Sequence, residues 1–383
     1  MDKVMQWLDA HEGELIECYK ELHKIPELGM AEFKTSAILA EELRKAGFTV
    51  KDKIGGTGIV GVIKGSEPGV NFALRADMDA LPMEEKTGLP FSSTHPGVMH
   101  ACGHDAHSTM VLFVAKAIAA TGGIKRGTLT IVFQPAEETL QGARVMMESG
   151  ELKGIDEMVG IHVRRNNEAK VGQARCGIMH AGCWRVEAKI HGKAAHSAWI
   201  HNGINVLEAV AAIVNGLNAI HGDPNISHSV KMTRCYAGGE AINIIPELAQ
   251  IAIDVRCQTN DLMNELIEKT KRAIETGCAG IGATCEMFNM NGVPAASFDD
   301  ALLKDAMASI AAVLGEENAL PPVASPGSED FHCYAVEAGI KTAFVGIGAD
   351  MTTGGHTSTM QLDLKALPHG AKVLAHLVKS KLG

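Results

Sequence analysis

Short apolar runs that read as buried strands alternate with helical segments at both ends of this 383-residue chain. A strand covered on both faces shows as a continuous apolar run, and alternation of such strands with helices gives a sheet flanked by helices. The pattern therefore predicts an α/β fold. The expected strands are 58–63, 71–77, 128–134, 158–163 and 341–347, and the expected helices are 104–120, 142–149, 300–314, 364–381 and the first 46 residues.

The order of elements changes in the middle of the chain, between residues 183 and 290. There the pattern predicts a strand, a helix, two strands, a helix and a strand, which is the order of a ferredoxin-like unit. The α/β pattern then resumes. We therefore expect a larger domain from 1–180 and 292–383, and a smaller α+β domain from 181–291 inserted into it.

Composition limits the classes of partner. The net charge is −10 and the acidic residues are spread along the chain, which argues against a nucleic-acid or anionic-membrane binder. No apolar run approaches the roughly 18 residues of a membrane-spanning helix, and the first residues carry acids where a signal peptide needs an apolar core. We expect a cytoplasmic protein whose nine scattered cysteines are mostly reduced thiols.

The run HACGHDAH at positions 100–107 stands where a long loop, 78–102, meets a predicted helix. Loops of that length in compact domains usually carry function. A thiolate at Cys102 and an imidazole at His104 could face one metal ion. Asp105 could hold an imidazole in the tautomer that binds metal, as supporting carboxylates do. The alternative is a surface histidine cluster beside a structural cysteine.

The segment QPAEE at 134–138 follows a predicted buried strand, at the kind of strand end where α/β proteins build their sites. Adjacent carboxylates repel each other, so Glu137 and Glu138 at a buried strand end need a cation or a proton nearby. One of the two could bind metal while the other acts as a general base on water. The alternative is a solvated helix N-terminus, which favours acidic residues.

Two further histidines lie near predicted strand ends. His162 falls within the apolar run 158–163, and His356 lies in a glycine-rich loop after the run 341–347. A histidine in a buried strand is often a hydrogen-bonded core residue, which is the alternative for His162. Taken with the cysteine, His104 and the two glutamates, these histidines indicate a two-metal hydrolase site.

Several motifs occur in the order found in one family. They are LHKIPEL at 22–28, RADMDALP at 75–82, CGHDAH at 102–107, QPAEE at 134–138, GIH at 160–162, NIIP at 243–246 and GSEDF at 327–331. Over almost its whole length the chain resembles the M20 metallopeptidase family, in particular the amidohydrolase branch with hippurate hydrolases, N-acyl-amino-acid deacylases and auxin-conjugate hydrolases. The resemblance implies a di-metal peptidase catalytic domain, in which helices flank a mixed sheet, and an inserted ferredoxin-like α+β lid through which the chain forms a homodimer.

The resemblance also implies roles for the metal-site residues. Two divalent ions, of Mn, Zn, Co or Ni, would share Cys102 as a bridging ligand. Glu137 would be the general base, and Asp77, Asp79 and Asp105 would support the ligands without touching metal. The remaining metal ligands would be His104, Glu138, His162 and His356.

In the inserted domain, His196 resembles a histidine that polarises the scissile carbonyl, and Asn243 and Arg256 resemble groups that hold the substrate carboxylate. A donor at His196 would stabilise the developing oxyanion, and an arginine suits bidentate carboxylate binding. We therefore expect a metal-dependent amidohydrolase that cleaves small N-acyl amino acids with metal-activated water. The alternatives are a dipeptidase or carboxypeptidase on the same fold, a non-catalytic metal-bound binding protein, and a redox protein that uses Cys102.

Overall fold

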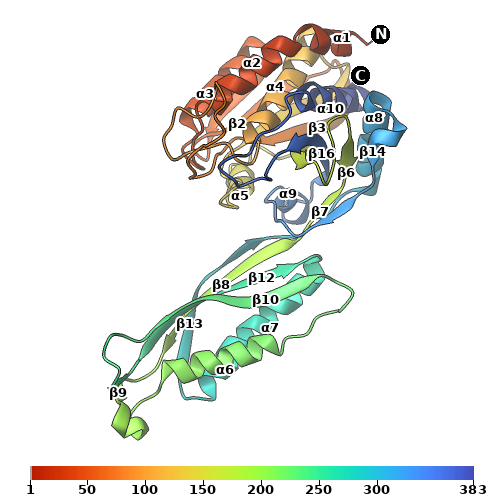
Figure 1. The fold of residues 1–383 in the computed structure, drawn as a ribbon. Coiled ribbons are helices and arrows are strands. Elements are labelled where there is room, and N and C mark those ends of the chain that lie inside the picture. The colour runs from red at the N-terminus through yellow and green to blue at the C-terminus, as the bar shows by residue number, and fades with distance from the viewer. Residues whose placement is uncertain (1) are drawn as a thin grey trace. The chain divides into compact units, whose positions relative to one another are not determined.

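The computed structural model describes residues 2–383, and the chain folds into two compact units (Figure 1). The first unit contains the chain up to Ile178, then Ser297–Val323 and Asp330–Gly383. The second unit contains Met179–Ala296 and Ala324–Glu329. The α/β class expected from the sequence is confirmed.

The segment Ala324–Glu329 differs from the sequence prediction, which assigned all of 292–383 to the larger domain. Two hydrogen bonds tie this segment to the start of the second unit. The Ala181 N–H donates to the Ser325 carbonyl at 2.9 Å, and the Ser328 hydroxyl donates to the Ala181 carbonyl at 2.8 Å. Because both bonds join residues far apart in the sequence, the local pattern gave no sign of them.

An eight-stranded mixed sheet forms the centre of the first unit. In spatial order its strands are β1 (Thr49–Ile54), β2 (Gly58–Lys64), β4 (Arg126–Gln134), β3 (Glu67–Asp77), β5 (Glu157–Arg165), β16 (Lys341–Met351), β6 (Ala174–Cys176) and β14 (Ala319–Leu320). The neighbours β4, β3, β5 and β16 pair in parallel, so their carboxyl ends meet at one edge of the sheet. All five runs predicted as strands lie in this sheet, whereas the charged edge strand β1 and the short strands β6 and β14 were missed.

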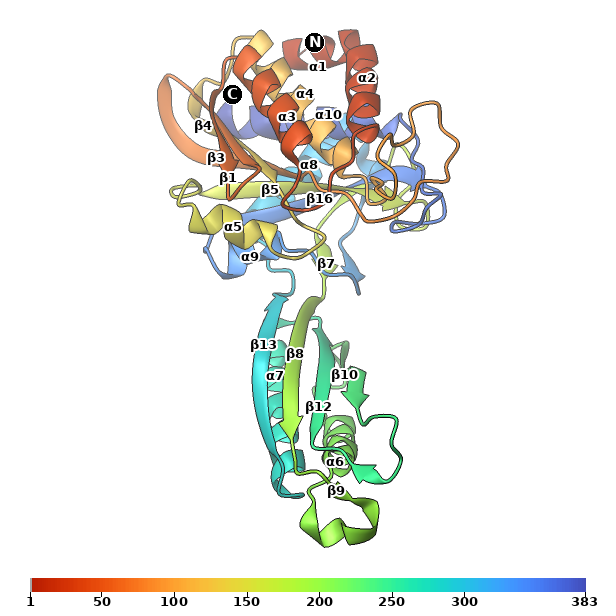
Figure 2. The ribbon, with the colours of Figure 1, turned by 90° about the vertical axis from the view of Figure 1, so that its left-hand side faces the viewer.

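Helices cover both faces of this sheet (Figure 2). The first 46 residues, predicted to be helical, form three helices. The second and third of these are separated by residues 24–32, which include Pro26, a residue that cannot continue a helix. One face of the sheet carries α1 (Lys3–Ala10), α2 (Glu12–His23), α3 (Phe33–Lys45), α4 (His104–Ala120), α8 (Asp300–Leu314) and α10 (Ala366–Leu382), and the other carries α5 (Gly142–Glu148) and α9 (His332–Val336).

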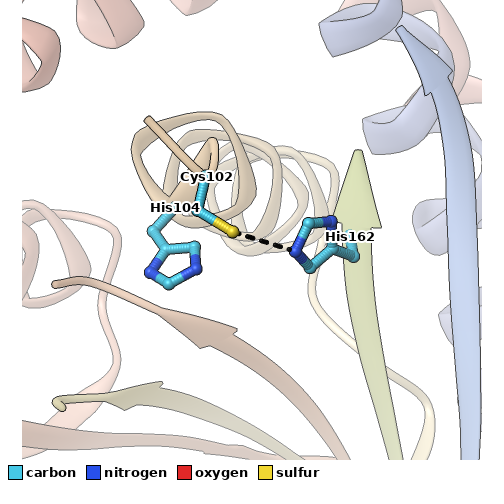
Figure 3. Close-up of side chains that lie close together, drawn as sticks. All are labelled: Cys102, His104 and His162. Carbon is cyan, nitrogen blue, oxygen red and sulfur yellow. Dashed lines mark hydrogen bonds between the residues drawn. The ribbon is translucent and has the colours of Figure 1, made fainter. Parts of the chain in front are cut away.

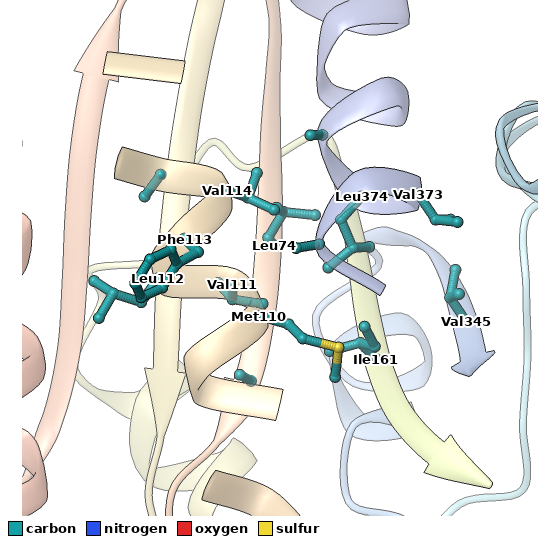
Figure 4. Packing of buried hydrophobic residues seen from close by; sticks show 14 of the residues in the cluster. Leu74, Met110, Val111, Leu112, Phe113, Val114, Ile161, Val345, Val373 and Leu374 are labelled. Carbon is teal, nitrogen blue, oxygen red and sulfur yellow. The ribbon is translucent and has the colours of Figure 1, made fainter. Parts of the chain in front are cut away.

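Helix α4 lies at the centre of the core of this unit. Its side chains are buried nearly all round, because the sheet, α2 and α10 cover it. Gly103, just before the helix, has a φ of 96°, and a Cβ there would lie 2.5 Å from Val163 Cγ2, so only glycine lets α4 begin this close to β5. Figure 4 shows part of the core, including Leu74, Met110, Val114, Ile161 and Leu374.

In the second unit, a four-stranded antiparallel sheet carries two helices on one face (Figure 2). The chain order of strand, helix, two strands, helix and strand is that of the predicted ferredoxin-like unit. The unit has a core of its own. In spatial order the strands are β10 (His228–Ala237), β12 (Leu248–Cys257), β8 (Gly182–His191) and β13 (Thr284–Val293), and the helices are α6 (Val206–Asn218) and α7 (Asn260–Ala279).

Several short elements complete the structure. They are the strands β7 (Ile178–His180), β9 (Ala195–His196), β11 (Ile244–Ile245) and β15 (Val323–Ser325), and the 3-10 helices η1 (Ser197–Asn202) and η2 (Glu316–Asn318). Among residues 2–383, none of the helices combines the length and the apolar character that crossing a membrane requires.

A fully buried arginine ties together three segments of the first unit. Arg75 of β3 donates from Nη1 to Asp77 Oδ2 at 2.7 Å, from Nη2 to Asp330 Oδ1 at 3.0 Å and from Nε to Gln134 Oε1 at 2.9 Å. The Gln134 amide also donates to Asp330 Oδ1, at 2.8 Å. Since a buried charge is costly without a partner, the guanidinium and the two carboxylates depend on one another.

Replacing Arg75 with Met should lower the free energy of unfolding by about 3–5 kcal/mol, because Asp77 and Asp330 would stay buried without their cation. The matched control is Arg144→Met, which removes a partly exposed ion pair with Glu337 and should cost about 1 kcal/mol or less. Urea denaturation of each purified variant measures the two losses. Equal losses would contradict the structural role given to Arg75.

Candidate metal centre

The candidate ligands gather at the edge of the first unit's sheet where its parallel strands end. Helix α4 begins at this edge with His104, and His162 lies near the end of β5. Glu138 follows β4, and His356 lies in the loop after β16. The carboxyl ends of parallel strands are where α/β proteins form their sites. All five predicted metal ligands therefore come to one place.

Cys102, His104 and His162 form one group of potential ligands (Figure 3). Their ligand atoms all lie within 4.8 Å of one another, and Cys102 Sγ is 3.4 Å from His162 Nε2. His162 Nδ1 lies 2.6 Å from the Val163 carbonyl oxygen, which assigns the proton to Nδ1 and leaves the Nε2 lone pair facing the thiol. That tautomer is the one in which Nε2 can bind a metal ion.

Without a cation, the Cys102 thiol and the His162 imidazole of this group are both uncharged. Burial and the nearby Glu138 carboxylate raise the pKa of the Cys102 thiol to about 12. Burial also holds the pKa of His162 well below its usual value. A bound cation would reverse the balance at Cys102, because a metal ion favours the thiolate.

Glu138 belongs to a second group, with Cys102 and His356. Glu138 Oε1 lies 3.2 Å from His356 Nε2, and this hydrogen bond raises the pKa of His356. Burial alone would raise the pKa of Glu138, but His356 and His104 together lower it overall. Because Cys102 is a member of both groups, its sulfur is the atom that links them.

His104, Glu137 and Glu138 form a third group around one buried nitrogen. His104 Nε2 has no hydrogen-bond partner among residues 2–383, and it lies 3.9 Å from both Glu137 Oε2 and Glu138 Oε1. Burial disfavours a charged ring, but Asp77, Cys102 and Asp79 together outweigh burial and hold the pKa of His104 well above its usual value. An orphan ring nitrogen that faces two carboxylates is suited to a shared cation.

Asp79 supports this group from behind. Its Oδ1 lies 3.2 Å from His104 Nδ1, which directs the other ring nitrogen toward the glutamates. The same carboxylate accepts the backbone N–H of Glu137 at Oδ1 and that of Glu138 at Oδ2, both at 3.0 Å. Asp79 therefore touches a ligand and the backbone of both glutamates, as a supporting carboxylate does.

Asp77 supports a different imidazole, that of His107. Asp77 Oδ1 lies 2.6 Å from His107 Nδ1, and His107 Nε2 accepts the Val163 N–H at 2.9 Å. Both nitrogens of His107 are thus occupied, so this residue joins β3 to β5 and has no lone pair left for metal. This role of His107 was not predicted, although its spacing of three residues from His104 puts both on one face of α4.

Asp105 was predicted to hold a metal-binding imidazole, and here the structure corrects the prediction. The Asp105 carboxylate lies 2.6 Å from Nδ1 of His23, which is outside the predicted ligand set. Burial disfavours charge on His23, but Asp105 and Glu85 together raise its pKa to about 9. Asp105 follows His104 at the start of α4 and points toward α2, because adjacent helix residues face different directions.

The three remaining predicted residues lie in the second unit. His196 pairs with Ile244 across β9 and β11, and its Nδ1 accepts the Ala198 N–H at 3.1 Å. The Asn243 carbonyl accepts the Ser197 N–H at 2.9 Å, so His196 and Asn243 lie on adjoining segments.

Arg256 lies apart from them on β12, where it lines a pocket of about 330 Å³. Its Nε is 2.9 Å from Asp254 Oδ2, and its Nη1 donates to Ser328 Oγ at 3.0 Å. A substrate carboxylate at Arg256 would therefore compete with the Asp254 carboxylate.

The donor set of the first unit fits two divalent metal ions. It offers a thiol sulfur, three imidazoles and two carboxylates, which is the range of ligands that Zn, Mn, Co and Ni accept. One of the buried ligand atoms, His104 Nε2, has no hydrogen-bond partner among residues 2–383. Buried polar atoms are normally satisfied, so this nitrogen is explained best as a metal ligand.

Comparison with known proteins places the chain in a family. The model of peptidase family M20/M25/M40 matches residues 73–380. A thermostable carboxypeptidase 1 of Saccharolobus solfataricus is 33% identical over 371 residues, covering 94% of this chain and 93% of the relative. An N-acetylcysteine deacetylase of Bacillus subtilis is 33% identical over 373 residues, covering 96% of this chain and 97% of the relative.

The fold comparison agrees with the sequence match. A solved structure from Bacillus subtilis, described as a dinuclear metal binding peptidase from the M20 family, superposes with a TM-score of 0.81 at 31% identity, covering 98% of this chain and 100% of that one. The resemblance inferred from the motifs is thus confirmed. With a family match over most of its length and full-length relatives, the chain belongs to peptidase family M20/M25/M40 and is a hydrolase.

Proposed function

We propose that this protein is a metal-dependent amidohydrolase that cleaves the amide bond of small N-acyl amino acids. The observation that carries the proposal is the position of Glu137. Its carboxylate is nearly fully buried and lies 3.9 Å from the unpartnered His104 Nε2, beside the groups linked by Cys102. A buried carboxylate next to a candidate metal site, but outside the predicted ligand set, is suited to act as a general base.

Five residues would hold the ions. Cys102 would be shared by them, because it belongs to two of the ligand groups, one with His104 and His162 and one with Glu138 and His356. When bound, the ions act as Lewis acids that polarise a carbonyl oxygen and lower the pKa of water. The other four ligands would be His104, Glu138, His162 and His356.

Glu137 would move the proton during hydrolysis. Its carboxylate takes a proton from the attacking water, whose oxygen adds to the carbonyl carbon. The carboxylic acid then donates that proton to the amide nitrogen as the carbon–nitrogen bond breaks, which releases a carboxylic acid and a free amino acid. Asp79 keeps Glu137 in place through its backbone N–H.

The substrate roles in the second unit are part of the proposal. His196 would donate a hydrogen bond to the carbonyl oxygen as negative charge develops there. Asn243 and Arg256 would hold the α-carboxylate of the amino acid. We also propose a cytoplasmic homodimer formed through the second unit, where β10 and β13 are the outer strands of the sheet. Light scattering of the purified protein would test the dimer.

A panel of substrates tests the activity. Acetyl, benzoyl and indoleacetyl amino acids and a set of dipeptides are incubated with the protein, with and without chelator and with added Mn, Zn, Co or Ni. Metal-dependent release of amine from an acyl conjugate is the expected result. Turnover of peptides alone would favour the second candidate, a carboxypeptidase or dipeptidase, since one relative of similar identity carries a carboxypeptidase name. Metal binding without any turnover would favour a binding protein.

Replacing Glu137 with Gln should lower kcat by about 10²–10⁴-fold, because the amide cannot accept the proton from water. Metal content should stay at the wild-type level, since Glu137 is not a proposed ligand. Steady-state kinetics and elemental analysis measure the two quantities. Glu151→Gln, which changes a carboxylate at the surface, is the control and should keep full activity. A wild-type kcat in Glu137→Gln would refute the base.

Replacing Cys102 with Ser should release at least one metal ion per chain, because a hydroxyl is a far weaker ligand than a thiolate for these metals. The control is Cys278→Ser, which changes a buried thiol in the second unit. Elemental analysis after dialysis against metal-free buffer gives the content of each variant. Full occupancy of two ions in Cys102→Ser would rule out the bridging role.

A further inference from the structure

We propose that Glu32 is a positioning residue for the adjacent glutamates Glu137 and Glu138, an inference that rests on the proposed function of those two residues. Glu32 lies directly before α3 and is fully buried. It is more than a hundred positions away from the glutamates in sequence. Its carboxylate nevertheless bonds to the turn that carries them.

Two hydrogen bonds define the environment of this carboxylate. Glu32 Oε1 accepts the backbone N–H of Ala136 at 2.9 Å, and Oε2 accepts the Thr57 hydroxyl at 2.6 Å. The Ser36 hydroxyl donates in turn to the Thr57 carbonyl at 2.6 Å. Thr57, which Ser36 of α3 holds in place, therefore fixes one oxygen of the carboxylate. The other oxygen bonds to the Ala136 N–H of the glutamate turn.

The bonded residue is one with unusual backbone geometry. Ala136 has a φ of 52°, in the left-handed region that alanine rarely adopts. Such a conformation persists only where the surroundings hold it. Glu32 helps to stabilise this backbone conformation, because its carboxylate accepts the N–H of Ala136.

Glu32 and Asp79 together accept the backbone N–H groups of the glutamate turn. Glu32 takes the N–H of Ala136, and Asp79 takes the next two, from Glu137 and Glu138. Three successive N–H groups around a left-handed residue thus face two buried carboxylates, an arrangement in which backbone dipoles favour anions. Removing the carboxylate of Glu32 or Asp79 would leave part of the turn without these hydrogen bonds. The side chains of Glu137 and Glu138 would then shift with the turn backbone.

The segment before Glu32 also packs on the turn. The Ala80 N–H donates to the Glu27 carbonyl at 2.8 Å, which holds this segment beside Asp79. A Cβ on Gly29 would lie 3.0 Å from Ala136 Cα, so the two backbones are nearly in contact. The LHKIPEL region and the residues that follow it therefore form one wall of the glutamate turn.

The test uses the full chain and two readouts. Hydrogen exchange of the peptide over residues 134–139, in metal-free protein, reports on the turn itself. Calorimetric titration with Mn reports on the site. Glu32→Ala should speed exchange in this peptide by tenfold or more and weaken Mn binding by about 10–100-fold, as loss of a supporting group does. Glu32→Gln keeps an oxygen acceptor and should stay within about threefold of wild type.

Two more variants make the test specific. Glu27→Ala is the matched control, because the Glu27 carboxylate also accepts backbone N–H groups, but they are those of Lys34 and Thr35 in α3 and not those of the turn. It should leave both readouts near wild type. Gly29→Ala places a Cβ against Ala136 without removing Glu32, so it should also speed exchange and weaken Mn binding. This variant replaces Glu32→Ala in the test if that variant fails to fold.

The outcomes separate this inference from the proposed function. Unchanged exchange over residues 134–139 in Glu32→Ala, or in Gly29→Ala where the first variant does not fold, would overturn the positioning role. Equal effects of Glu27→Ala and Glu32→Ala would also overturn it. If the wild type binds no Mn but Glu32→Ala alone opens the turn, the positioning role stands and the proposed metal chemistry fails.

Discussion

The Asp79 carboxylate joins the two halves of the candidate metal centre. It bonds to His104 Nδ1 on one side and to the backbone N–H groups of Glu137 and Glu138 on the other. One side chain thereby fixes the tautomer of an imidazole from α4 and the direction of two carboxylates from the loop after β4. The loop and the helix come from different parts of the chain, so their relative position depends on this shared partner.

Charge balance explains why so many acidic side chains tolerate burial here. The Arg75 guanidinium compensates the carboxylates of Asp77 and Asp330 behind the site, and His107 forms a hydrogen bond with Asp77. In front of it, burial raises the thiol pKa of Cys102, and the Glu137 and Glu138 carboxylates face the unpartnered nitrogen of His104. The proposed divalent ions would supply the positive charge that this front face needs.

The sequence predicted which residues gather at the candidate metal centre, because strand ends leave a local signature. An apolar run followed at once by His, Glu or a glycine-rich loop marks each of the positions around Cys102. The supporting contacts were harder to predict, since they join distant segments. Asp105 bonds to His23 rather than to a ligand, His107 joins two strands, and Glu32 reaches a turn that no local pattern connects with it.

The fold was predictable to a similar degree and for the same reason. Buried strands and the ferredoxin-like order follow from local apolar patterns. The charged edge strand β1 has no continuous apolar run, and the segment Ala324–Glu329 joins the second unit through long-range hydrogen bonds. Substrate choice lies beyond any such pattern, because Arg256, the proposed partner of the substrate carboxylate, already bonds to the Asp254 carboxylate.

Anomalous diffraction from crystals grown with Mn or Zn would test the central claim most directly. The account predicts two metal peaks per chain, with Cys102 Sγ as a ligand of both and with His104, Glu138, His162 and His356 completing the set. Glu137 should lie beside the ions without binding either of them. A single peak, or peaks held by other residues such as His23 and Asp105, would contradict the account.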